Sequence, residues 1–129
     1  MHACRRRVAT AATVAGALLL TGCGSLGADE VQSVATAFAG DDDAARCHLL
    51  APSALASLLQ DSPTCEDAIK DLPVGSGHVV SVQVWGEEAQ AKLADDTLFL
   101  TRTTDGWRVM AAACKAQGAD QPYDCQLEG

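Results

Sequence analysis

The sequence predicts an α+β domain, in which N-terminal helices pack on a curved four-stranded antiparallel sheet held by two disulfides. Three observations lead to this prediction. Apolar residues recur with a period near 3.6 up to the segment 72–77, and with a period of 2 beyond it. Asp105-Gly106 stands between two alternating runs, which is typical of a β-hairpin. The region 29–129 also contains an even number of cysteines, which favours disulfides in an exported domain.

The first helix is expected in the segment 29–40. Its apolar residues fall on one helical face, at Val31, Val34, Ala35 and Phe38. We expect Asp29 to cap its start and Gly40 to follow its end.

Three shorter helices are expected at 41–52, 52–60 and 64–73. Acidic residues 41–43 suit the positive end of the first, although an Asp triplet can also suggest calcium; no spaced Asp-x-Asp-x-Asp-Gly loop is present. Pro52 is expected to end the helix at 41–52 and to lie near the first turn of the helix at 52–60. Thr64 is expected to cap the helix at 64–73, which Pro73 ends. The middle helix presents one apolar side, formed by Leu55, Leu58 and Leu59.

Four strands are expected, at 78–86, 89–94, 97–104 and 107–114, with turns at 86–87, 95–96 and 105–106. Val80, Val82 and Val84 alternate with polar residues in the first strand. In the last hairpin, pairing of Thr104 with Trp107 would place one set of side chains on a common face, namely Leu98, Leu100, Val109, Ala111 and Ala113. Phe99 and Met110 would then lie on the other face. No periodicity is found in the tail, 115–129, so it is expected to be irregular.

Four cysteines, Cys47, Cys65, Cys114 and Cys125, can form disulfides in three pairings. We favour Cys47–Cys65 and Cys114–Cys125, because each closes a modest local loop and the two flank different elements. A zinc site is the rival interpretation, but no C-x-x-C pair occurs. We predict no metal and no cofactor.

The N-terminus carries the pattern of an export signal. Three arginines precede 13 uncharged residues, from Val8 to Leu20. That run is short for a membrane span, which needs about 20 residues, and suits a signal peptide core of about 7–15. Leu20-Thr21-Gly22-Cys23 then resembles the bacterial lipobox. The resemblance implies cleavage before Cys23 and attachment of a diacylglyceryl group to its sulfur. The alternative is an ordinary secretory signal with an incidental cysteine, and the route of export, Sec or Tat, stays open.

The expected organisation is therefore a lipoprotein signal peptide at 1–22, a lipidated tether at 23–28 and one α+β domain at 29–129. Cleavage would leave six of the nine basic residues and all 17 acidic residues, for a formal charge of −11. Such a domain does not bind nucleic acid by counterion release. Anionic headgroups would also repel it, so the lipid is expected to hold it at the outer, extracytoplasmic face of the cell membrane.

The order of elements resembles the NTF2-like or cystatin-like architecture, in which an N-terminal helix packs in the hollow of a bent sheet. The whole chain is also similar to a group of small actinobacterial lipoproteins. The segments that carry this similarity are LTGCG, AFAGDDDAARCHLLAP, CEDAI, GWRV with AAAC, and PYDCQLEG. As that group has no established activity, the resemblance implies a location and a fold but no reaction.

The sequence assigns no catalytic residue. His48 and His78 are not brought together by any spacing, and the serines lie in no nucleophile motif. Trp85 and Trp107 could stack a ligand, although strand tryptophans are more often partly buried. The main hypothesis is a non-enzymatic binding or interaction module of the cell envelope, with a protein partner or a small apolar ligand. The alternatives are an NTF2-like small-molecule-binding protein or an isomerase or cyclase, and, by fold analogy alone, a cystatin-like inhibitor.

Overall fold

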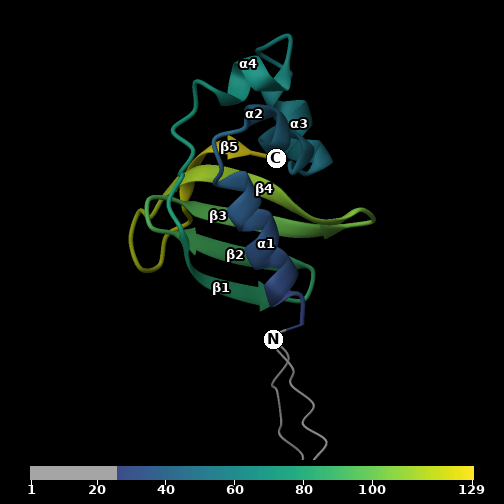
Figure 1. Cartoon of the computed structure of the whole chain (residues 1–129). Coiled ribbons are helices and arrows are strands. Elements are labelled where there is room, and N and C mark those ends of the chain that lie inside the picture. The colour runs from purple at the N-terminus through teal and green to yellow at the C-terminus, as the bar shows by residue number, and fades with distance from the viewer. Residues whose placement is uncertain (1–25) are drawn as a thin grey trace, which may run out of the picture.

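The structure, a computed structural model, describes residues 26–129 as four helices and one five-stranded antiparallel sheet (Figure 1). The α+β class is thus confirmed, as are the two disulfides. Cys23 and the predicted signal peptide lie outside the described residues. The helices are α1 (Ala28–Phe38), α2 (Asp43–His48), α3 (Pro52–Leu58) and α4 (Cys65–Ile69). The strands are β1 (Val79–Trp85), β2 (Glu88–Leu93), β3 (Thr97–Thr103), β4 (Gly106–Lys115) and β5 (Asp124–Glu128).

The sheet is a meander in the order β1-β2-β3-β4-β5, so it has one strand more than the sequence predicted. The additional strand, β5, forms within the tail that was expected to be irregular. It pairs with β4 from Ala111↔Glu128 to Lys115↔Asp124. Leu127 is buried, and the Cys114–Cys125 disulfide links two residues that are paired across the strands. Long-range pairing and a cross-link therefore order a segment that has little apolar pattern of its own.

Helix α1 crosses one face of the sheet (Figure 1) and buries the four residues that the periodicity predicted. Its start differs from the prediction. Gly27, with φ of 84°, is the N-cap residue, and Asp29 lies within the first turn. Glycine is required here because its φ is positive and because a Cβ would lie 3.1 Å from the Trp107 indole nitrogen.

The other three helices gather beyond the β4–β5 side of the sheet rather than in its hollow (Figure 1), which corrects the expected packing. Asp42 caps α2 by accepting from the Ala45 amide at 3.2 Å. Thr64 caps α4 as predicted, accepting from the Asp67 amide at 3.1 Å. The Cys47–Cys65 disulfide joins these two short helices, with a Cα–Cα distance of 6.1 Å. Isolated helices of five or six residues are unstable in water, so local helix propensity alone would not maintain α2 and α4. The disulfide stabilises them by joining the two helices.

Two predictions within these helices fail. Residues 49–51 separate α2 from Pro52 and lie beside β4: the amide of Ala51 donates to the Val109 carbonyl, and the Val109 amide donates to the Leu49 carbonyl. Pro52 begins α3, as expected, but the prediction that it ends α2 is wrong, because α2 already ends at His48. Leu59, expected on the apolar side of α3, is 44% exposed because the helix ends at Leu58.

Two irregularities in the strands change which side chains are buried. The β3–β4 hairpin turns at residues 104–105, so Leu100 pairs with Val109 rather than with Ala111. A register shift then places Ala111 opposite Phe99, and Ala112 joins the core instead of Ala111. A second shift between Val79 and Ser81 leaves Val80 62% exposed. A one-residue shift moves the side chains that follow it to the opposite face of the sheet, and the periodicity of the sequence does not show where such a shift occurs.

Candidate functional site

The hollow of the sheet contains a packed core rather than a cavity. The largest fully buried side chains of the described domain, most of them in this core, are Trp107, Phe38, Ile69, Leu98, Leu100, Leu127, Val31 and Val109. Trp107, one of the two candidate stacking residues, is 1% exposed and therefore belongs to this core. None of these eight side chains carries an ionisable group. Within residues 26–129, buried apolar side chains therefore fill the side of the sheet that α1 covers.

The described residues also form an apolar recess on the opposite face of the sheet, and we call it the back groove. It has a volume of about 440 Å³, within the usual range for small-molecule sites. Strands β1 to β5 and the loop before β5 all contribute to it. Its lining residues are Trp85, Glu88, Ala89, Phe99, Met110, Ala111, Pro122, Tyr123, Cys125, Glu128 and Gly129.

Aromatic and sulfur-containing side chains form the apolar part of the back groove. The rings of Phe99 and Tyr123 meet edge to face, with centroids 5.2 Å apart. Trp85 remains 41% exposed at the end of the edge strand. Met110 is brought into the groove where the β3–β4 register shifts, and its flexible thioether can adapt to an occupant. The sequence correctly placed Phe99 and Met110 together on this face.

Two carboxylates, Glu88 and Glu128, line the same groove, and no lysine or arginine is among its lining residues. Thr101 donates its hydroxyl hydrogen to Glu88 at 3.0 Å and orients that carboxylate. Ion pairs within residues 26–129 are confined to α2 and α4, so neither groove carboxylate is paired. Arg108 lies opposite Thr101 on β4, but its guanidinium donates to the Trp107 carbonyl at 2.8 Å.

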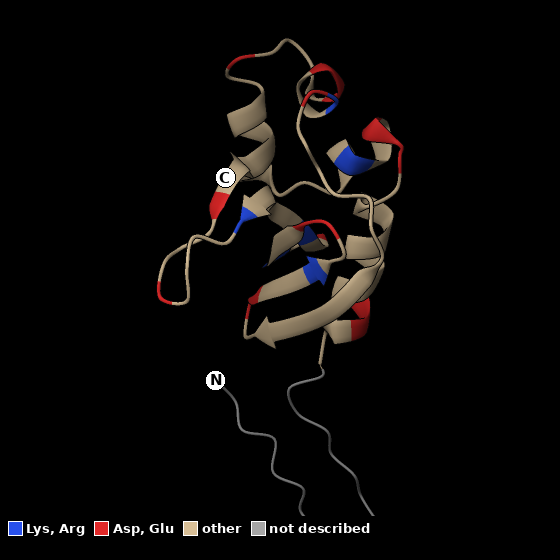
Figure 2. Cartoon of the chain, turned by 90° about the vertical axis from the view of Figure 1, so that its left-hand side faces the viewer, with Lys and Arg blue, Asp and Glu red and all other residues tan. Residues whose placement is uncertain are grey.

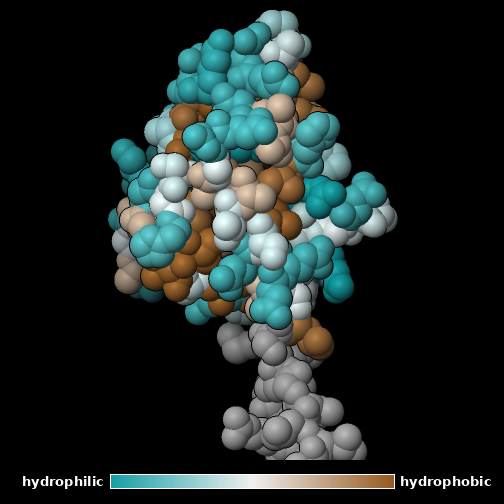
Figure 3. Space-filling view, viewed as in Figure 1, coloured by the Kyte–Doolittle hydropathy of each residue, from teal (hydrophilic) through white to brown (hydrophobic). Residues whose placement is uncertain are grey.

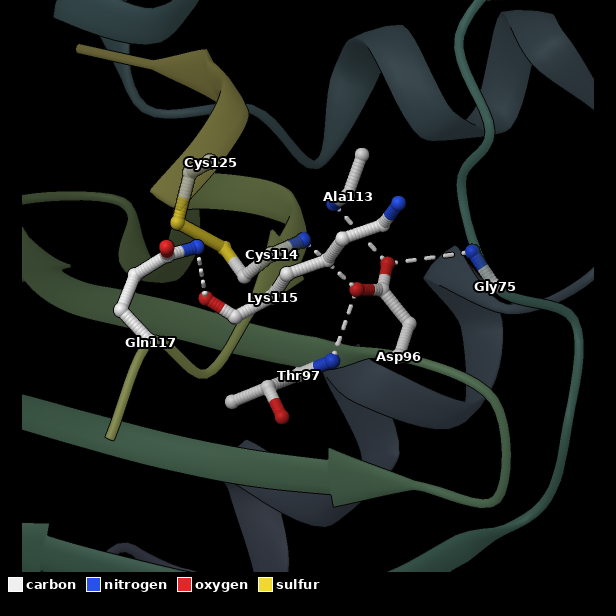
Figure 4. Close-up of a disulfide and its surroundings, with 8 residues drawn as sticks. All are labelled: Gly75, Asp96, Thr97, Ala113, Cys114, Lys115, Gln117 and Cys125. Carbon is white, nitrogen blue, oxygen red and sulfur yellow. Dashed lines mark hydrogen bonds between the residues drawn. A yellow bond between two sulfur atoms is a disulfide. The ribbon is translucent and has the colours of Figure 1, made fainter. Parts of the chain in front are cut away.

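The wall formed by the tail depends on the Cys114–Cys125 disulfide and on the backbone next to it (Figure 4). Asp96 accepts hydrogen bonds from four backbone amides: Thr97 at 2.7 Å, Ala113 and Cys114 at 2.9 Å, and Gly75 at 3.1 Å. One carboxylate thus joins the β2–β3 turn, the end of β4 and the connection that enters the sheet.

Asp95, the neighbouring residue, makes a similar but more exposed set of contacts. It accepts from the Ser76 amide at 3.0 Å and from the Gly77 amide at 2.7 Å. These two hydrogen bonds hold the pKa of the Asp95 carboxyl below its ordinary value, since they favour the charged form. The predicted turn at 95–96 is therefore correct, and the sequence Gly75-Ser76-Gly77 is more than a flexible connection because its amides bind this turn.

The remaining candidate residues do not converge on a site. His48 and His78 are both exposed; His78 lines a second open hollow, between α1 and the start of β1, and His48 does not. Within residues 26–129, no group of three or more His, Cys, Asp or Glu side chains is arranged to hold a metal ion. In this same part of the chain, every helix is too short or too polar to cross a bilayer.

Sequence reasoning missed Glu88, Tyr123 and Glu128. Tyr123 could have been found, because it lies two residues before Cys125, whose expected bond to Cys114 returns the tail to the sheet. Glu88 and Glu128 could not have been identified as site residues from the sequence, since exposed glutamates are common on strands and at chain ends. Comparisons with protein-family models, with curated proteins and with solved structures find no match to this chain.

Proposed function

We propose that the protein is a lipid-anchored, extracytoplasmic binding module with a modified NTF2-like or cystatin-like fold, and that the back groove is its binding surface. The observation that carries the binding role is the contrast between the two faces of the sheet. One face is filled by α1 and the core, whereas the other has an open apolar recess lined by the exposed Trp85 and the half-buried Phe99 and Tyr123. An exposed apolar recess rimmed by polar groups is typical of a binding site.

The proposed anchor rests on the lipobox resemblance at Cys23 and on the short distance to the domain. The five residues from Gly24 to Ala28, where α1 begins, would connect the lipidated Cys23 to the domain. Five extended residues span at most about 17 Å, which would keep the domain next to the membrane surface. A diacylglyceryl group provides two acyl chains, and two chains are enough for stable attachment.

The charge of the domain is consistent with attachment through lipid rather than through headgroups. Acidic segments are spread over turns and helix ends, and basic segments are few (Figure 2). The helical end of the molecule is hydrophilic, while an apolar area lies where β1 begins (Figure 3). With six basic and 17 acidic residues after position 22, the domain would gain little attraction to an anionic bilayer, which supports attachment through the proposed lipid.

Intact mass spectrometry of membrane-extracted protein tests the anchor. We expect a mass that lacks residues 1–22, carries a diacylglyceryl adduct and falls by four hydrogens for the two disulfides. The variant Cys23→Ser should remain unlipidated and uncleaved at this site. Cys4→Ser is the matched control, because that cysteine lies in the expected signal peptide, and it should be processed like the wild type. Normal processing of Cys23→Ser, or a full-length reduced chain in the cytosol, would refute the proposal.

A further inference from the structure

The back groove combines three features that together select a class of ligand: aromatic faces, a concave apolar floor and unpaired negative charge. Trp85, Phe99 and Tyr123 supply the rings, and Glu88 and Glu128 supply the charge. Aromatic rings attract cations through their negative faces, and the attraction strengthens when the cation loses water. Carboxylates at the rim add a longer-range attraction for the same charge.

Other ligand classes fit these features less well. An anion would meet two carboxylates and no cationic side chain among the lining residues. A metal ion would need several converging oxygen or nitrogen ligands, and no group of three such side chains occurs within residues 26–129. A neutral apolar molecule could contact the apolar floor, but it would gain no electrostatic attraction from the two carboxylates.

We propose that the back groove binds a small organic cation whose charge lies on an alkylated nitrogen, of the trimethylammonium type; this inference rests on the proposed binding function. Such a group is apolar at its surface, is weakly hydrated and keeps its full positive charge. It can contact the rings of Phe99 and Trp85 through its methyl groups, while its charge is balanced by the rim. Met110 and Tyr123 close the recess around it. Because the charged domain is acidic overall, the cation is also attracted from a distance.

Choline and its neutral carbon isostere, 3,3-dimethylbutan-1-ol, provide a matched pair of probes. They share a shape and nine equivalent methyl protons, and they differ in charge. Saturation-transfer NMR on those methyl protons, with the native protein extracted from membranes in an uncharged maltoside detergent, measures binding of each probe. Empty micelles give the background. We expect choline to bind saturably and at least roughly tenfold more tightly than the alcohol.

Variants of Glu88 and Glu128 then test whether their charges cause the preference for choline over the alcohol. Glu88→Gln with Glu128→Gln preserves side-chain size and removes both charges, and we expect it to weaken choline binding by roughly tenfold while leaving the alcohol unaffected. Glu87→Gln is the matched control: Glu87 is exposed in the adjacent turn, does not line the groove and should bind choline like the wild type. Phe99→Leu, which retains an apolar side chain, should weaken choline binding by loss of a ring face.

The outcomes separate this inference from the proposed function. Equal binding of both probes, lost in Phe99→Leu, would overturn the choice of a cation and would support a groove for apolar groups in general. An equal loss in Glu87→Gln and in the double variant would overturn it too, because the attraction would then be non-specific. Absence of saturable binding by either probe would overturn both the cation inference and the small-ligand role of the groove, whereas the mass spectrum would still decide the anchor.

Discussion

Asp96 is predicted to contribute far more to stability than its neighbour Asp95, although both accept hydrogen bonds from backbone amides. In Asp96, Oδ1 accepts from the amides of Thr97 and Cys114, and Oδ2 accepts from those of Gly75 and Ala113. Replacement of Asp96 by asparagine turns one of these oxygens into an amide donor, which faces two N–H groups. Each part-buried group left without a partner costs about 1–3 kcal/mol, so we expect a loss of about 3–5 kcal/mol.

Asp95→Asn is the matched control. Asp95 and the two amides that it accepts from are exposed, and water can replace the lost hydrogen bonds. We therefore expect a loss of about 1 kcal/mol or less. Urea unfolding of the oxidised full chain, followed by far-UV circular dichroism, measures both variants. With a slope of about 1.5 kcal/mol per M, Asp96→Asn should lower the midpoint by roughly 2–3 M. Equal midpoints for the two variants would refute the role assigned to Asp96.

Three further predictions concern the carboxyl of Asp95, the Cys47–Cys65 disulfide and the exposed edge of β1. Because amide hydrogen bonds lower the pKa of Asp95, this residue stabilises the fold at a pH above its unfolded-state pKa, and the stabilisation is lost as the pH falls through its folded-state pKa. Urea unfolding at several pH values between about 2 and 6 should therefore show that the free energy of unfolding depends less on pH in Asp95→Asn than in the wild type. Removal of the Cys47–Cys65 disulfide by alanine at both positions should cost about 3 kcal/mol, and hydrogen exchange should show lost protection in α2 and α4 while the sheet stays protected. Val80 is exposed on the unpaired edge of β1, a strand without charge or proline, so Val80→Lys should reduce light scattering at high concentration and change stability by less than about 0.5 kcal/mol.

Local patterns predicted most elements of this fold, because each pattern depends on residues close together in the chain. The stripe on α1, the cap at Thr64 and the turn at 86–87 are all local signals, and all three are found. The disulfide pairing was also predictable from loop length. The start of α1 was not, because Gly27 is selected by its contact with Trp107, 80 residues later in the sequence.

The errors in the sheet share one physical cause: they depend on pairing between distant segments. Strand β5 exists because β4 extends to Lys115 and presents an edge to the tail. The shifts near Val80 and Met110 depend on how neighbouring strands twist, and they reverse the facing of the residues that follow. The common face of Phe99 and Met110 was predictable from the alternation in β3 and β4, but the groove around them also requires the tail, which has no apolar periodicity.

The two disulfides consequently act on different parts of the molecule. Cys47–Cys65 stabilises helices that lie beyond the sheet and contribute no residue to the back groove. Cys114–Cys125 holds the strand and loop that supply Pro122, Tyr123 and Glu128 to it. Since α1 occupies the hollow, the tail is the element that turns a flat sheet face into a recess. Binding should therefore depend on the second disulfide, which holds the loop that carries Pro122 and Tyr123. The core should tolerate loss of this disulfide, because Leu127 and the strand pairs at 111–112 can still hold β5 in place.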